Sequence, residues 1–362
     1  MRALFLHPAP EVSSLIRGGL FFFRLAFTIV WTGWLFKDLH HLKYFVLGVG
    51  GALGGMILNM ILYTFRQEGR LTVATFGVNT FGHLMAIFGI IFFAYFLGMN
   101  RKNSPLIAKM GLGAAAGLCA IFALMAGTRM SLAMMGIGFF WLLAFRPLAS
   151  ITRKMMTLLS IAAVGAVFIF FIFRANPGIA KRVTDPLILL ENPSQMQQIA
   201  ELYSRFQIWN SSMEMIISSP ILGIGPGQWN FVRHMYGFRM HGNPWLDWVV
   251  LDSHNGYLHF GAEYGVPAML LYYLILLFAI WSGHKAIRIL LSKRPFEPPD
   301  VILFVSILRG LSLAIVLWMM SDITNASNIN VRVQGMLYLI IGVLVWSPLL
   351  VQNKLAQNRS TE

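Results

Sequence analysis

Cysteine and charged residues are both scarce in this sequence of 362 residues. A single cysteine, Cys119, excludes an intrachain disulfide and a metal site built from several cysteines. Charged residues make up only 12% of the chain, hydrophobic residues make up 57%, and the mean hydropathy is +0.67. These values lie far outside the range of soluble domains. The composition therefore indicates a protein of the lipid bilayer.

Long apolar runs recur along the chain, and runs of about 18 or more residues are candidates for membrane-spanning helices. They are not the strands of a membrane barrel, which would alternate with period two. The sequence predicts an all-α, polytopic membrane bundle of about nine or more spans. The candidate runs are 19–36, 43–65, 80–98, 105–126, 130–146, 154–173, 265–283, 301–320 and 333–351.

Positive charge orients the predicted helices, because short loops rich in lysine and arginine stay in the cytoplasm. The residues that mark this side include Lys37, Lys43, Arg101, Lys102 and the run from Lys285 to Arg294. Residues 174–263 then fall on the opposite side. The predicted parts are N-terminal transmembrane helices at 1–173, a large outer loop domain with amphipathic helices at 174–263, and C-terminal transmembrane helices with a cytoplasmic tail at 264–362.

The formal net charge of +14 is a feature shared with nucleic-acid-binding proteins. Most of the surplus lies on the predicted cytoplasmic rim, where it fits the orientation rule and the anionic leaflet. The outer loop carries similar numbers of positive residues and carboxylates, so it is nearly neutral. We therefore expect membrane lipid, and not nucleic acid, as a partner.

Two segments of the outer loop domain have distinct patterns. Residues 192–220 open with Asn192 and Pro193 as helix start signals, and their apolar residues recur at helical intervals. This pattern predicts an amphipathic helix that rests on the membrane or on the bundle. The next segment, "PILGIGPGQWNF" (220–231), has glycines and prolines that end a helix and permit close backbone approach. A plain turn is the favoured interpretation, and a phosphate-cradling nest is the alternative.

A histidine lies where the outer loop meets the seventh predicted span, in "LDSHNGYLHFGAEYG" (251–265). Asp252 or Ser253 is a good N-cap, which places His254 in the first turn of the helix that continues as that span. A helix N-terminus disfavours added positive charge, so a neutral imidazole is expected there, and a neutral imidazole is a competent general base. Taken alone, His254 also fits an interfacial histidine that only caps or snorkels.

Two arginines favour a functional role for this face. Arg129 lies in the tight turn "AGTRMSLA", on the side where the orientation rule predicts few positive residues. Arg205 lies in "LYSRFQIW", on an otherwise apolar helix, with Glu201 one turn earlier as a candidate partner. Each fits an ordinary surface ion pair. Together with a base on the same face they indicate an anion site, since guanidinium groups bind phosphate oxygens bidentately.

The order "GTR-S", "SRFQIW", "P-LGIGPGQW" and "DSHNGYLHFGAEYG" resembles the O-antigen ligase and polymerase superfamily of bacterial envelopes. The resemblance runs from about residue 70 to about residue 350 and is strongest at 204–265. This chain is shorter at its N-terminus than those relatives, which usually carry more helices. The resemblance implies a GT-C-like membrane glycosyltransferase with a periplasmic loop domain. Its location would be the bacterial inner membrane, with the active site facing the periplasm.

The resemblance also implies a reaction and roles for residues. The donor would be a glycan on undecaprenyl pyrophosphate, and the acceptor a sugar hydroxyl of the lipid A core. His254 would be the base, and Arg129 and Arg205 would hold the pyrophosphate. Pyrophosphate is a good leaving group whose charge arginines can stabilise, so we expect neither a metal nor a cofactor. Further substrate-binding residues are expected at Arg70, Trp209, Gly225, Asn255, Tyr257 and Arg332.

Three functions are consistent with these residues. An O-antigen ligase is favoured by the overall spacing of the motifs and the modest outer loop. A polymerase that extends the same polyprenol-linked glycan shares the motifs and the chemistry. An anion or lipid transporter is the alternative from another class, because arginine within a span, such as Arg309, is a functional candidate. A transporter, however, predicts paired broken helices or an inverted repeat, and the sequence shows neither.

Overall fold

The computed structural model of the chain is helical apart from one short hairpin, within the residues that it describes. Those residues are 20–62, 65–67, 70–72, 77–99, 105–144, 200–237, 252–293, 298–326 and 331–360, with single positions between 152 and 178. Within these described residues, six helices are long and apolar enough to cross a membrane, and two shorter apolar helices accompany them. The prediction of a polytopic helical membrane protein is confirmed.

These eight apolar helices coincide with eight of the nine predicted spans. The other predicted span, 154–173, lies almost wholly outside the described residues. The apolar helices are α3 (Phe21–Leu35), α4 (His41–Leu62), α5 (Val78–Gly98), α6 (Leu106–Ala126), α7 (Arg129–Ala144), α14 (Val266–Lys293), α15 (Pro298–Ser321) and α16 (Val331–Ser360). The remaining elements are β1 (Phe65–Gln67), β2 (Arg70–Thr72), α10 (Ala200–Ser218), α11 (Trp229–Val232), the 3-10 helix η2 (Arg233–Tyr236) and α13 (Gly256–Tyr264).

The chain forms two compact units, and each combines segments that are distant in the sequence. The first unit comprises Met1–Trp31, Leu187–Phe278 and Met319–Leu339. The second comprises Thr32–Pro186, Ala279–Trp318 and Ile340–Glu362. The predicted division at residues 173 and 263 follows the order of the chain instead, and it stays a prediction.

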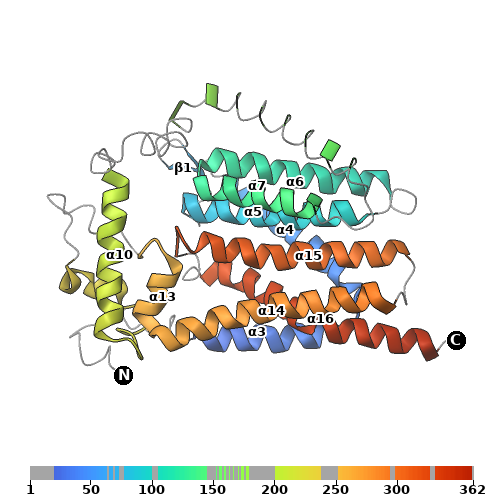
Figure 1. Ribbon diagram of the computed structural model, residues 1–362. Helices are drawn as coiled ribbons and strands as arrows, with labels where there is room; N and C mark the ends of the chain where they lie inside the picture. The colour runs from blue at the N-terminus through green and yellow to red at the C-terminus, as the bar shows by residue number, and fades with distance from the viewer. Residues whose placement is uncertain are drawn as a thin grey trace. The chain divides into compact units, whose positions relative to one another are not determined.

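Helix α5 is the core of the second unit, where α6 and α7 run beside it (Figure 1). Most of its residues are buried, including Phe81, Phe88 and Phe92. A helix that is apolar all round is expected to be buried on all sides, as α5 is. Helix α6 is equally apolar, yet most of its surface is exposed, as expected for a helix that faces lipid. The hairpin adds a small strand pair to the predicted all-helical fold, with Phe65 opposite Thr72 and Gln67 opposite Arg70.

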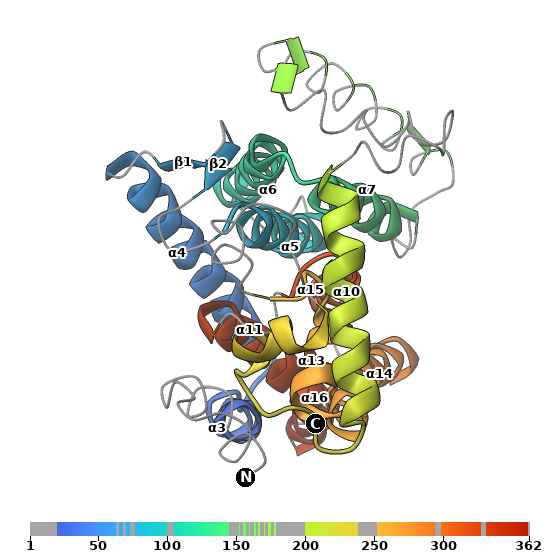
Figure 2. The same ribbon diagram turned by 90° about the vertical axis from the view of Figure 1, so that its left-hand side faces the viewer.

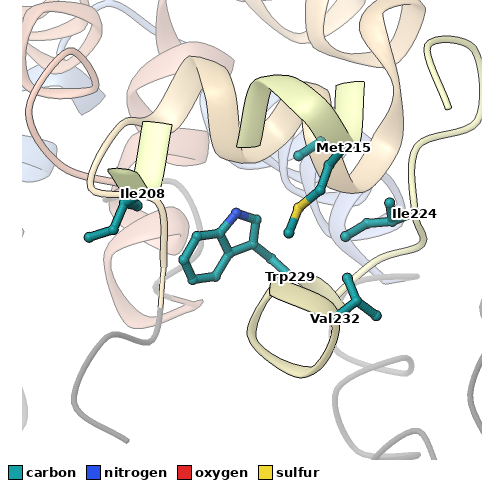
Figure 3. Close-up of a cluster of buried hydrophobic side chains, with 6 residues drawn as sticks. Ile208, Met215, Ile224, Trp229 and Val232 are labelled. Atoms are coloured by element: carbon teal, nitrogen blue, oxygen red, sulfur yellow. The ribbon is translucent and has the colours of Figure 1, made fainter. Parts of the chain in front are cut away.

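Helix α10 packs on α13 in the first unit (Figure 2). Its buried face carries Ile208 and Met215, which surround the indole of Trp229 together with Ile224 and Val232 (Figure 3). Trp229 is fully buried. The predicted amphipathic helix is therefore present and rests on its own unit through this face. Its predicted start at residues 192 and 193 lies outside the described residues.

The glycine-rich segment contacts the first residue of α14. The backbone N–H of Val266, the first residue of α14, donates to the Pro220 carbonyl at 2.8 Å, so the glycine-rich segment lies at the start of α14. Helix α14 has 28 residues and is long enough to span a bilayer. It continues through Lys285 and Lys293 at its far end, where the sequence predicted a loop. The positive residues of α14 therefore lie at the opposite end from the glycine-rich segment.

Candidate active site

The start of α13 differs from the predicted one. Asn255, and not Asp252 or Ser253, is the N-cap, and its side-chain oxygen accepts a hydrogen bond from the Leu258 N–H at 3.0 Å. Asp252 instead closes a turn, because its Oδ1 accepts from the His254 N–H at 2.7 Å. The prediction that His254 lies inside the first helical turn was therefore wrong. His254 precedes the helix.

His254 has an unusual backbone conformation. Its φ is +49°, and it is the only non-glycine residue with positive φ among the described residues. Such a conformation is costly for a residue with a Cβ, and residues of this kind gather at functional sites. The imidazole is about one-third exposed, and its Nδ1 lies 3.3 Å from Oδ1 of Asp252. That distance is within ion-pair range, although the pair lacks hydrogen-bond geometry. The fold thus holds a reachable imidazole beside a carboxylate.

The segment that follows α15 fixes the start of α13. The Gly256 N–H donates to the Asp322 carbonyl at 2.6 Å, and the Asn255 side-chain amide donates to the Ile323 carbonyl at 3.2 Å. The Tyr257 hydroxyl donates to the Met319 carbonyl at 3.0 Å. A Cβ on Gly256 would lie 2.6 Å from the carboxyl carbon of Asp322, so only glycine fits there. These contacts explain why the helix begins at Gly256.

Asp322 is fully buried beneath this segment. Its Oδ2 accepts a hydrogen bond from the Tyr273 hydroxyl at 3.0 Å. Burial raises the pKa of Asp322 well above its ordinary value, so the carboxyl favours its neutral form. Burial, and then the nearby Asp322, also raise the pKa of Tyr257. Tyr257 stacks on Tyr273 with ring centroids 4.2 Å apart, which gives this predicted substrate residue a fixed orientation.

The glycine-rich segment wraps around the other end of α13. The N–H groups of Gly227 and Trp229 donate to the two carboxylate oxygens of Glu263, at 2.9 and 3.0 Å. The N–H of Gly225 donates to the Glu263 carbonyl at 3.0 Å, and that of Ile224 to the Ala262 carbonyl at 2.8 Å. Backbone N–H groups in such turns form an anion-binding nest. The anion that this nest holds in the structure is the chain's own carboxylate.

Where α13 meets α14, the backbone makes close contacts at two glycines, Gly265 and Gly223. Gly265 has φ +84°, and a Cβ there would lie 2.1 Å from the Ile221 carbonyl oxygen. Gly223 has φ +66°, and its Cβ would lie 2.4 Å from the Glu263 carbonyl. The predicted continuous helix from residue 252 into the seventh span was wrong, because α13 ends at Tyr264 and α14 begins at Val266. The close glycine contact requires this break.

His259 and Glu263 form a buried pair that was not predicted from the sequence. Their side chains are buried, and His259 Nε2 lies 3.5 Å from Glu263 Oε2. Burial disfavours the imidazolium of His259, but the Glu263 carboxylate outweighs burial, so the pKa of His259 is raised. The available signal was the spacing of the two residues, since positions four apart share a helix face.

The other predicted site residues are divided between the two units. In the first, Arg205 lies partly exposed on α10, and Trp209 of the same helix packs against the Trp229 cluster. In the second, exposed Arg129 is the first residue of α7, and the Thr128 and Ser131 hydroxyls are hydrogen-bonded beside it. Arg70 lies in β2 and Arg332 in the first turn of α16, but their side chains are outside the described residues. The proposed partnership of Arg129 with Arg205 therefore stays a prediction.

Part of the chain is similar to a known family. Residues 114–273, less than half of the chain, match the family described as O-antigen ligase. The matched residues begin in α6, end in α14, and include Arg129, Arg205, the glycine-rich segment and His254. No curated protein matches the chain. The family supports a transferase role, as an O-antigen ligase or polymerase that acts on lipid-linked glycans.

Proposed function

We propose that this chain is an O-antigen ligase of the bacterial inner membrane. It transfers a glycan from undecaprenyl pyrophosphate to a sugar hydroxyl of the lipid A core, at the periplasmic face and without a metal ion or cofactor. The observation that carries the proposal is the environment of His254, which lies within the residues that match the family. A partly exposed imidazole in a costly backbone conformation lies beside the carboxylate of Asp252 at the start of α13.

His254 acts as the general base in this proposal. A proton on Nδ1 faces Asp252, which leaves the lone pair of Nε2 for the proton of the acceptor hydroxyl. The hydroxyl oxygen attacks the anomeric carbon of the donor, and the bond from that carbon to the pyrophosphate oxygen breaks. Undecaprenyl pyrophosphate leaves, and the imidazolium that forms is stabilised by the Asp252 carboxylate.

Arg205 stabilises the leaving pyrophosphate. Negative charge on this group increases toward the transition state, and a guanidinium can bind two of its oxygens at once. Arg129 has the same role by resemblance to the family. Its position at the first residue of α7 favours an anion, because backbone N–H groups and the helix dipole at an N-terminus attract negative charge.

The periplasmic location can be tested by labelling α10 and the far end of α14. Cysteine replaces exposed Asn210 on α10 or exposed Ser292 near the end of α14, and the native Cys119 is buried. A membrane-impermeant thiol reagent added outside intact cells stripped of their outer membrane should label N210C and not S292C, since positive residues stay in the cytoplasm. Labelling of S292C alone would show that the protein has the opposite orientation in the membrane.

The role of His254 is tested with His254→Ala, and His234→Ala is the matched control because His234 is an exposed histidine of η2. Loss of a general base costs on the order of a hundred- to ten-thousandfold in turnover. Donor affinity should stay nearly normal, because the base acts on the acceptor proton. Near-normal turnover of purified His254→Ala, or an equal loss in His234→Ala, would contradict the assignment.

A further inference from the structure

A chain of hydrogen bonds connects α13 to α10 through a single buried tryptophan. The Trp229 N–H donates to Glu263 Oε1 of α13 at 3.0 Å. Its indole Nε1–H donates to the Ser212 hydroxyl of α10 at 2.9 Å, and that hydroxyl donates to the Ile208 carbonyl at 2.9 Å. Trp229 is fully buried, so no water competes for these bonds. We refer to Glu263, Trp229 and Ser212 as the Trp229 bridge.

The carboxylate in this bridge is costly to keep. Glu263 is 4% exposed and lies at the C-terminal end of α13, where the helix dipole disfavours negative charge. Two backbone N–H groups and His259 offset that cost. An apolar side chain of similar volume would fill the same space without the cost of burying a charge. What the carboxylate adds is direction, because each oxygen fixes the position of one N–H group.

We propose that Glu263 is a positioning residue for the transfer reaction. Through Trp229 and Ser212 it fixes α10 against α13, and with α10 it fixes the place of Arg205 relative to the segment that carries His254. The inference rests on the proposed function, since it takes Arg205 as the group that binds pyrophosphate and His254 as the base. It assigns Glu263 no contact with substrate.

The bridge leaves little room for α10 to shift. Backbone hydrogen bonds from Ile224 and Gly225 to the end of α13 flank it, and Gly223 approaches Glu263 too closely for any Cβ. A displacement of about 1 Å at a reacting group can cost on the order of a hundredfold in rate. Loss of the bridge is therefore expected to reduce turnover even where the protein stays folded.

Ser212→Ala breaks the α10 end of the bridge with the smallest change. Ser211→Ala is the matched control, because both serines are buried on α10 and both hydroxyls donate to the carbonyl four residues earlier, but only Ser212 accepts from Trp229. Ser212→Ala should lower kcat about fivefold, as expected for one lost hydrogen bond, and Ser211→Ala should change it less than about twofold. Equal effects of the two variants would overturn the inference.

Glu263→Gln weakens the other end, because its amide offers one acceptor oxygen where the carboxylate offers two to the N–H groups of Gly227 and Trp229. Exposed Glu214 of α10 supplies the control Glu214→Gln. We expect Glu263→Gln to lower kcat about a hundredfold in the native background and much less when Arg205 is already lysine. A role in stability alone would give the same loss in both backgrounds, and that result would overturn the inference. An Arg205→Lys variant with native kinetics would instead contradict the proposed function. If Glu263→Gln does not fold, Ser212→Ala in the two backgrounds makes the same test.

Discussion

The two ends of helix α13 are built in opposite ways. At the C-terminal end, Glu263 is buried and both carboxylate oxygens accept backbone hydrogen bonds. At the N-terminal end, His254 is about one-third exposed, has positive φ, and its Nδ1 makes no hydrogen bond despite the nearby Asp252. One end supplies rigidity and the other presents a reactive group. A catalytic side chain needs such a support, because loosely held groups lose reaction geometry.

Gly265→Ala should have the largest effect, because it breaks the rigid end. The residue has φ +84°, and a Cβ would overlap the Ile221 carbonyl oxygen. We expect a loss of about 3 kcal/mol or more in the free energy of unfolding in detergent. Gly111→Ala is the control, since Gly111 lies on exposed α6 with nothing near its Cβ position, and alanine should stabilise that helix. A neutral Gly265→Ala would contradict the close contact.

Asp252→Asn should affect the reactive end and leave the rigid end intact. Asparagine retains an oxygen that accepts from the His254 N–H, but it loses the charge that stabilises the imidazolium. Loss of a charged interaction of this kind corresponds to a decrease of about ten- to a hundredfold in turnover. Steady-state turnover and the unfolding midpoint should be measured on the same preparation. Unchanged turnover would remove Asp252 from the mechanism.

Asn255→Ala should loosen the start of α13 moderately. The substitution removes the N-cap bond to Leu258 and the bond to the Ile323 carbonyl. Loss of an N-cap typically costs about 1 kcal/mol. Asn255→Asp keeps a capping oxygen but loses the amide donor, so its unfolding free energy should fall between those of the native protein and Asn255→Ala. An alanine variant as stable as the native protein would show that another residue caps the helix.

The smallest expected effect is a pH dependence at the rigid end. The pKa of His259 is raised because the Glu263 carboxylate outweighs burial. The pair therefore stabilises the fold fully below the unfolded pKa of about 6.5, and this contribution is lost as pH rises through the raised folded value. Unfolding midpoints measured across this range should fall for the native protein more than for His259→Gln. Parallel curves would show that the pair does not titrate there.

The sequence predicted the membrane spans well because long apolar runs report directly on the bilayer. It could not decide where α13 begins, since Asp252, Ser253 and Asn255 are all good caps. The start of α13 is fixed by the Gly256 N–H, which donates to the carbonyl of Asp322 on a segment distant in the sequence. A pattern of local preferences contains no information on such a partner.

For the candidate site, the sequence supplies the residue types and not their contacts, and the roles of these residues stay predictions. The motif order identified His254 and Arg205 as candidates, because their residue types carry the chemistry. The glycine-rich segment was read as a turn or a phosphate nest, whereas the structure gives a nest around the side chain of Glu263. Its anion comes from a residue more than thirty positions later in the sequence, and the spacing of glycines alone does not reveal it.

The most direct test of the proposed function is reconstitution of the purified chain in liposomes with a glycan on undecaprenyl pyrophosphate, lipid A core and a chelator of divalent ions. We expect the glycan to become attached to the lipid A core, and we expect His254→Ala to form no such product while still binding the donor. Extension of the glycan on undecaprenyl pyrophosphate, with lipid A core unmodified, would identify a polymerase instead. A product that forms only when a divalent ion is restored would contradict the metal-independent mechanism.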